Sequence, residues 1–211
     1  MSQSHARYSL AWNPNPPLTT ARLVSVALAA GMYTALSWQG VITLPMGIAG
    51  VSALLVAVGF GIPFAIWLGF WGLLIGYVGT FLGAGLLGNV PFLIAIPFGF
   101  VDWIQFGVPL LAYRALAPRL GLDPVGKDVY TVKGFLFFLV FGAVLPNGLG
   151  ALYGIAVLSA GGLVPPGAFW LSTLLWWAGN IVVCVVISPA LLRGITPLME
   201  RFGLTTLGLI T

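Results

Sequence analysis

The chain has 211 residues, of which 60% are hydrophobic and only 6% are charged. A soluble domain carries roughly a quarter of charged residues, so this composition excludes a water-soluble enzyme, and the high apolar content excludes a disordered chain. The single cysteine excludes a disulfide framework and any metal site built on several cysteines, which leaves an integral membrane protein.

The first segment, which includes the prolines at positions 14, 16 and 17, cannot be helical through those residues. It lacks the charged start and apolar run of a signal peptide, so we expect it to be retained. Residues 1–19 are predicted to form a cytoplasmic tail, residues 20–192 a transmembrane domain, and residues 193–211 a second cytoplasmic tail.

Six transmembrane helices are predicted after this tail. No charged residue occurs from Leu23 to Val101, a stretch long enough for three helical spans of about 20 residues each. The alternating pattern of a transmembrane barrel is absent, so the spans are expected to be helices, which satisfy their own backbone hydrogen bonds. With breaks at glycine and proline clusters, the predicted helices cover residues 20–38, 45–65, 67–87, 91–116, 132–159 and 167–192.

The positions of the charges support this number of helices. With six spans, all 8 lysine and arginine residues fall on one side, and the loops on the other side have none. Five or seven spans would scatter them over both sides. Because basic residues in short loops mark the cytoplasmic face, the fold class predicted is an all-α, multi-pass bundle of six transmembrane helices in the plasma membrane, with both termini cytoplasmic. The basic charge then faces anionic lipid headgroups and is no signal for nucleic acid.

One acidic residue, Asp102, falls near the middle of the fourth predicted helix. An ionisable group at this depth costs at least about 2.5 kcal/mol, and such groups usually face a protein interior or a wet cavity. A ligand contact is therefore favoured for Asp102, and a protonated structural hydrogen-bond donor is the alternative.

Polar amides occur at similar depth in each of the last three predicted helices. They are Gln105, Asn147 and Asn180, and two indoles, Trp176 and Trp177, precede the last of them. One interpretation is a polar cavity that binds a small molecule among helices 4, 5 and 6. The other is hydrogen bonding between packed helices, which is ordinary for amides in membrane proteins.

Several other functions have no candidate residues in the sequence. Paired carboxylates, a Ser-His-Asp set and an HExxH motif are absent, so no enzyme activity, metal site or cofactor is expected. His5 is expected in solvent, and Cys184, alone on an apolar helix, is expected to act as a small hydrophobic side chain. No phosphate-binding loop of the Walker type occurs, so the chain cannot hydrolyse ATP by itself.

The first predicted helix carries a stripe of small residues, Ala27, Gly31 and Ala35, at every fourth position. Such stripes most often serve packing inside a bundle, and the alternative is a docking groove for the helix of a partner protein.

Taken together, these features resemble the substrate-binding S components of energy-coupling-factor transporters. The resemblance implies six helices, cytoplasmic termini and a vitamin-like ligand among the last three helices, contacted here by Asp102, Gln105, Asn147, Trp176 or Trp177, and Asn180. It also implies that the stripe on the first helix, with Gly31 in place of an alanine, docks on a coupling subunit in the membrane that works with ATPases.

A second resemblance is carried by shorter motifs. Pro45-x-Gly47-Ile48-Ala49, Trp176-Trp177-x-Gly179-Asn180 and Pro189-x-Leu191-Leu192 resemble the first family of membrane-associated sensor domains. Those domains usually have Asp where Asn180 stands and precede an output domain, so signalling by this chain would need a separate partner.

The leading prediction is thus a membrane protein that captures a small molecule from outside for uptake with a partner ATPase module. A ligand-sensing domain that acts through a separate partner is the first alternative. A structural subunit or assembly factor of a larger membrane complex is the second.

Overall fold

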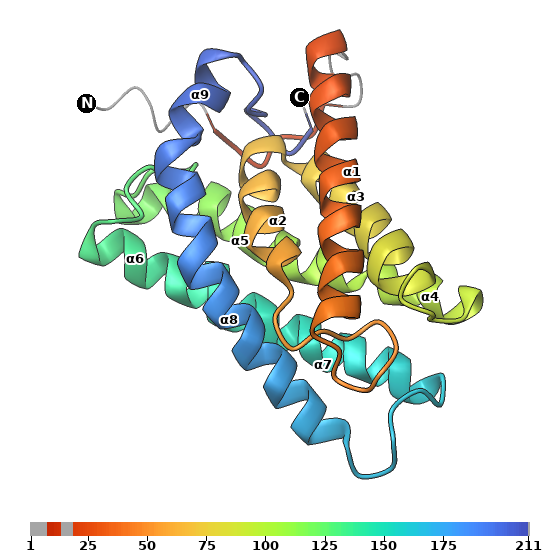
Figure 1. The fold of residues 1–211 in the computed structure, drawn as a ribbon. Helices are drawn as coiled ribbons and strands as arrows, with labels where there is room; N and C mark the ends of the chain where they lie inside the picture. Colours follow the sequence, from red (N-terminus) through yellow and green to blue (C-terminus); the bar gives the residue numbers. More distant parts are fainter. Residues whose placement is uncertain (1–7, 14–18, 211) are drawn as a thin grey trace.

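The computed structural model describes residues 8–13 and 19–210, and all the regular secondary structure in these ranges is helical (Figure 1). Six helical segments follow one another along the described chain, several of them made of more than one helix. They are α1 (Thr20–Thr43), α2 (Val56–Leu68), α3 (Phe70–Gly79) with the π-helix η1 (Thr80–Leu86), α4 (Phe92–Gly99) with α5 (Val101–Ala115), α6 (Val132–Phe138) with the π-helix η3 (Leu139–Val144) and α7 (Leu145–Ala160), and α8 (Phe169–Gly194). The short helices η2 (Pro118–Leu120) and α9 (Thr196–Arg201) lie in connecting or terminal regions.

Three of the segments are long and apolar enough to cross a membrane, namely Phe92–Ala115, Val132–Ala160 and Phe169–Gly194. Helix α2 and the α3–η1 segment are apolar but shorter. Helix α1 has 24 residues but carries more polar side chains. The helices therefore indicate a membrane-associated protein, as the composition predicts.

The predicted helix over residues 45–65 is wrong in its first half. Residues 44–55 form a loop, in which Gly47 and Gly50 adopt φ angles of +75° and +78°. This left-handed conformation is incompatible with a right-handed α-helix and is open mainly to glycine. Helix α2 therefore begins only at Val56 and has 13 residues.

Helix α2 lies between α1 and α8 and packs against both, and it also contacts α3 and α5 (Figure 1). Two glycines permit this close packing. A Cβ atom on Gly59 would lie 2.8 Å from Ile187 of α8, and one on Gly61 would lie 1.9 Å from the Phe106 ring of α5. Most of α2 is buried, which explains how so short an apolar helix stays inside the bundle.

The two ends of the described chain meet at the turn between α2 and α3. Ser9 N donates to Leu207 O at 2.8 Å, and Leu209 N donates to Ala11 O at 2.8 Å. The turn itself uses Gly69, whose φ is +61°, and Phe70 N donates to Leu209 O at 2.7 Å. The N-terminal and C-terminal segments therefore pair beside this turn at one end of the bundle.

A buried arginine contacts α2 and both terminal segments. Arg114, near the end of α5, is 4% exposed and donates from Nη2 to Ile66 O at 3.0 Å and to Thr206 O at 2.8 Å. Its guanidinium also lies 4.6 Å from the centroid of the Tyr8 ring. The α2–α3 turn, α5 and both terminal segments are thus connected through Arg114.

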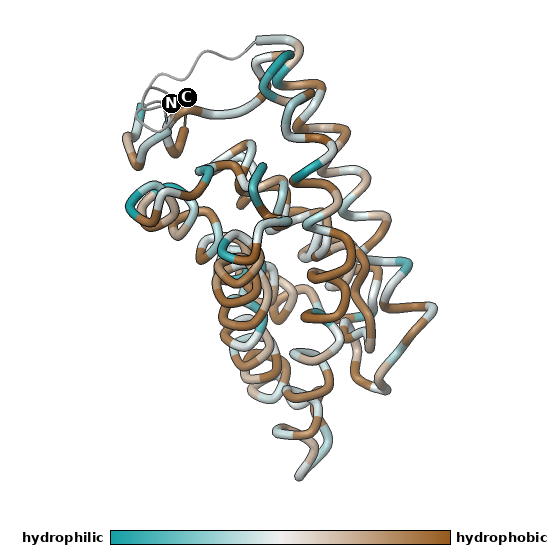
Figure 2. The backbone as a smooth tube through the Cα atoms, turned by 90° about the vertical axis from the view of Figure 1, so that its left-hand side faces the viewer, coloured by the Kyte–Doolittle hydropathy of each residue, from teal (hydrophilic) through white to brown (hydrophobic). Residues whose placement is uncertain are grey.

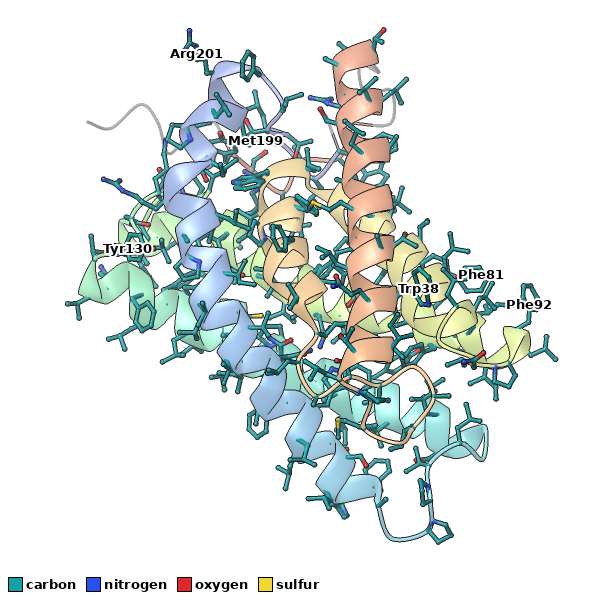
Figure 3. All side chains as sticks on the ribbon, in the orientation of Figure 1. Trp38, Phe81, Phe92, Tyr130, Met199 and Arg201 are labelled. Atoms are coloured by element: carbon teal, nitrogen blue, oxygen red, sulfur yellow. The ribbon has the colours of Figure 1, made fainter. Side chains whose placement is uncertain are left out.

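Charged side chains gather at this end. Lys127, in the connection between α5 and α6, forms ion pairs with Asp123 at 3.4 Å and with Glu200 of α9 at 2.9 Å. Figure 2 shows the most hydrophilic segments near the termini and a mostly hydrophobic tube elsewhere. In Figure 3, Met199 and Arg201 lie at the end where the chain terminates, whereas Phe81 and Phe92 lie together, away from it. The other end has loops 44–55, 87–91 and 161–168, none of which contains a charged residue.

Candidate functional site

The carboxyl group of Asp102 is satisfied within the bundle. Its Oδ2 accepts a hydrogen bond of 2.8 Å from Tyr33 Oη of α1 and a second one from Thr80 Oγ1 at the start of η1. Tyr33, Thr80 and Asp102 are all buried, with exposed fractions of 0%, 3% and 1%. Two hydroxyl donors from two other helical segments thus hold Asp102, so its Oδ2 accepts hydrogen bonds, whereas the structural alternative predicted from the sequence was a protonated donor.

Gln105, although three residues from Asp102 on the same helix, faces a different partner. Its Nε2 donates to Asn147 Oδ1 of α7 at 3.1 Å. Asn147 Nδ2 in turn donates to Ala143 O at 2.8 Å and contacts Cys184 Sγ of α8 at 3.4 Å. Three helices, α5, α7 and α8, therefore meet at a line of buried polar atoms that does not include Asp102.

Asn180 completes this group from α8. Trp176, Asn180 and Cys184 are spaced by four residues, so they share one face of the helix. Both polar atoms of the Asn180 side chain, Oδ1 and Nδ2, are buried and have no hydrogen-bond partner among the described residues. Gln105 Oε1 and Trp176 Nε1 are also buried without a hydrogen-bond partner among the described residues. We call Gln105, Asn147, Trp176 and Asn180 the amide cluster.

Two glycines of α7 let side chains of the amide cluster pack directly against the backbone of this helix. A Cβ on Gly150 would lie 2.2 Å from Gln105 Cγ, and a Cβ on Gly154 would lie 2.7 Å from the Trp176 ring. Cys184 contacts Asn147 and Trp176 meets Gly154, so Asn180 lies on α8 between two contacts with α7. Gln105, which meets Asn147 and Gly150, belongs to the same stretch of the bundle.

The π-helix η3 ends where the amide cluster begins. π-Helical turns widen the backbone and occur often at functional sites. Here the carbonyl of Ala143 accepts from Asn147 Nδ2, and the carbonyl of Val144 accepts from Trp177 Nε1 at 2.8 Å. Trp177 is only half-buried and lines an apolar groove between α7 and α8, so the structure places it outside the amide cluster.

The 44–55 loop closes the uncharged end of the bundle next to the amide cluster. A Cβ on Gly179 would lie 1.9 Å from Ala53 O, so the loop touches the residue that precedes Asn180. On its other side the loop borders a pocket of about 370 Å³ that also includes Gly88 and Asn89. The amide cluster itself is 0–4% exposed, so a molecule reaches it only when this packing opens.

The small-residue stripe on α1 faces outward. Ala27, Gly31 and Ala35 are all exposed, and a Cβ on Gly31 would have no neighbour within 4 Å. This position does not fit packing inside the bundle, and it leaves the stripe free for another chain or for lipid. Beside it, a pocket of about 310 Å³ lies between α1, α2 and α9.

Sequence reasoning missed two members of the Asp102 site and one contact of the amide cluster. Tyr33 and Thr80 lie in segments far from Asp102 along the chain, and a single hydroxyl in an apolar helix is too common to mark a site. Cys184 is buried, as expected of a small hydrophobic side chain, but its sulfur also contacts an amide. Cys184 follows Asn180 by four residues, and this helical spacing was the sequence feature that could have placed Cys184 on the same helix face.

No known protein family, curated protein or solved structure matches this chain. The two family resemblances therefore stay predictions that rest on the motifs quoted for them. Within residues 8–13 and 19–210, no group of three His, Cys, Asp or Glu side chains is placed to hold a metal ion.

Proposed function

We propose that this chain is a six-span plasma-membrane protein that binds a small molecule at the amide cluster, in the manner of an S component. The observation that carries the proposal is the set of buried, unpartnered polar atoms on Gln105, Trp176 and Asn180. A buried polar atom without a partner costs about 1–3 kcal/mol, and a ligand that supplies the missing hydrogen bonds removes that cost.

The arrangement of charges supports the six-span topology. The segments alternate in direction, and the end that contains Arg114, Lys127 and Arg193 is the one expected to face the cytoplasm. The 44–55 loop and the amide cluster then lie toward the outside. A ligand arriving from outside would meet this loop first.

Transport would require partners, because the sequence contains no phosphate-binding loop. The exposed stripe of Ala27, Gly31 and Ala35 gives such a partner a smooth helical surface, which favours close helix packing in a membrane. We therefore propose that a coupling subunit packs on α1 and that ATPases act through it.

A sensing role would use the same ligand site. The loop that carries the motif residues Pro45–Ala49 reaches the second motif through its later residues, because Ala53 and Leu54 contact Gly179. Binding would then change the packing of this loop and α8, and a separate partner would read that change. A purely structural subunit, the remaining alternative, would bind no small molecule.

The test compares wild type with Asn180→Leu by native mass spectrometry of the purified, detergent-extracted protein. Wild type is expected to carry a small-molecule adduct that Asn180→Leu lacks. Gln39→Leu, which removes an exposed amide from α1, is the matched control and should retain the adduct.

The stability of the same variant separates ligand binding from helix-to-helix hydrogen bonding. Since Asn180 has no partner, replacing it with leucine should raise the free energy of unfolding of the ligand-free protein by about 1–3 kcal/mol. If Asn180 instead held helices together, the variant would be less stable. Absence of an adduct from wild type, together with a destabilised Asn180→Leu, would contradict the proposed function.

A further inference from the structure

The hydrogen-bond chain in the amide cluster fixes which atom of Gln105 is free. Ala143 O can only accept a hydrogen bond, so Asn147 must turn its Nδ2 toward it. Asn147 Oδ1 then faces Gln105 and can only accept, so Gln105 must present Nε2 to it. The free atom of Gln105 is therefore its acceptor, Oε1.

The free atoms of the α8 side chains complement this acceptor. Trp176 Nε1 can only donate, and the Asn180 amide offers a donor and an acceptor side by side. A molecule that satisfies all of these atoms must bring at least one N–H or O–H donor for Gln105. It must also bring at least one acceptor for Trp176 and a paired donor and acceptor for Asn180.

No charged side chain takes part in this set. The carboxyl of Asp102 is held by Tyr33 and Thr80, and the guanidinium of Arg114 donates to carbonyls at the opposite end of α5. A charged ligand at the amide cluster would therefore have no charged side chain of this set to hydrogen-bond with, and burying a charge without such a partner is far more costly than burying a neutral polar group.

From these facts we infer that the ligand of the amide cluster is an uncharged, planar small molecule with a cyclic amide or ureide edge. This inference rests on the proposed function and names the ligand class of that site. A cyclic amide holds its N–H and C=O side by side, and the Asn180 amide matches such an edge with two parallel hydrogen bonds. Gln105 Oε1 accepts from a further N–H, and Trp176 Nε1 donates to a further carbonyl.

In this scheme Asn147 is a positioning residue. It does not contact the ligand, but it holds Gln105 in the orientation that accepts. Without Asn147, the Gln105 amide is free to turn and can offer either its donor or its acceptor. The preference for a ligand N–H at this point should then weaken.

Three ring compounds test the ligand class in equilibrium binding to the purified full chain. Uracil is neutral and has both N–H and C=O groups, 1,3-dimethyluracil keeps the ring and carbonyls but lacks N–H, and orotate adds a carboxylate. Wild type should bind uracil at least about tenfold more tightly than 1,3-dimethyluracil, the factor that corresponds to about one lost hydrogen bond. Orotate should not bind.

Two variants connect the result to the amide cluster. Asn180→Leu should abolish uracil binding, and Asn147→Leu should bring the affinities for uracil and 1,3-dimethyluracil closer together. Gln39→Leu is the control and should behave as wild type does.

The experiments distinguish an incorrect ligand class from an incorrect binding function. Suppose that wild type carries a co-purified adduct that depends on Asn180. The ligand class is then overturned if uracil does not bind, if 1,3-dimethyluracil binds equally well, or if orotate binds more tightly. The binding function itself would still stand in each of these cases. An unchanged preference for uracil in Asn147→Leu overturns the positioning role. Absence of any adduct that depends on Asn180 counts against the proposed function itself.

Discussion

Tyr33 Oη of α1 donates a hydrogen bond of 2.8 Å to Asp102 Oδ2 of α5, and both side chains are at most 1% exposed. This contact joins α1 and α5 through two residues that are 69 positions apart in the sequence. It accounts for the acidic group inside the apolar bundle, which is held by hydroxyl donors from Tyr33 and Thr80 and not by the amide cluster.

Removing the Tyr33 hydroxyl should therefore destabilise the protein. In Tyr33→Phe the Asp102 carboxyl loses one of its two donors, and the expected loss is about 1–3 kcal/mol in the free energy of unfolding, as for other buried polar groups that lose a hydrogen-bond partner. Denaturant unfolding in detergent measures it. Tyr130→Phe, at a position that is 63% exposed, should change nothing. If Tyr33→Phe and Tyr130→Phe are equally stable, the hydrogen bond between Tyr33 and Asp102 does not stabilise the fold.

Glycines on two helices should respond differently to alanine. A Cβ on Gly79 would lie 2.2 Å from Tyr33 Cδ1, so Gly79→Ala forces the ring away from Asp102 and should cost about 1–3 kcal/mol by overpacking. Gly31→Ala meets no neighbour within 4 Å and should stabilise α1 by up to about 1 kcal/mol. Thermal unfolding of the two variants side by side checks the difference. A loss of stability in Gly31→Ala would show that the stripe packs against something within the protein.

The sequence identified Asp102 and the amides because polar groups are rare and costly in apolar helices. It could not identify the partners of Asp102, since Tyr33 and Thr80 are ordinary residues in their own helices and only the packing brings them together. Nor could it separate Asp102 from Gln105, because a spacing of three residues still allows two side chains to face different neighbours.

The 44–55 loop shows a second limit of sequence reasoning. Residues 45–65 are as apolar as a transmembrane helix, and hydropathy does not distinguish a helix from a loop that is buried at the end of a bundle. The decisive feature is the positive φ of Gly47 and Gly50, which hydropathy does not report. A Cβ on Gly50 would lie 2.7 Å from the Val90 side chain, so that loop conformation is set by tertiary packing.

Arg114 should control the order of the C-terminal segment. Arg114→Met removes the donor shared by Ile66 O and Thr206 O, so amide hydrogen exchange in residues 204–210 should accelerate by about tenfold, which corresponds to about one hydrogen bond. Arg119→Met, at an exposed site, is the control. Unchanged exchange in Arg114→Met would mean that the backbone pairing alone holds this segment.

Lys127 should contribute a small, pH-dependent stabilisation. Burial lowers the pKa of Lys127, but its hydrogen bond to Glu200 and the nearby charges outweigh this effect, so the pKa is raised overall. A raised lysine pKa means that the stabilisation is complete below the ordinary value of about 10.4 and is lost as the pH rises through the raised value.

Because the ion pairs are partly exposed, Lys127→Met should lower the free energy of unfolding by no more than about 1 kcal/mol at pH 7. The difference from wild type should stay constant between about pH 7 and 9 and disappear in strong alkali. Arg201→Met, an exposed cation on α9, should show no such pH dependence. A difference that already changes below about pH 9 would exclude Lys127 as its source.

The proposed six-span topology predicts which loops can be labelled from each side of the membrane. The one native cysteine, Cys184, is buried, so Cys184→Ala provides a background without reactive thiols. In it, new cysteines replace Leu87 and Pro166, which are exposed in two uncharged loops, or Arg119 and Arg201 at the charged end. A membrane-impermeant maleimide should label the first pair in intact cells and the second pair only after lysis, because the basic end is expected inside. Labelling of position 119 in intact cells would invert the topology. Labelling of only one position of either pair would contradict six spans, since six spans place two crossings between the positions of each pair and so return the chain to the same face.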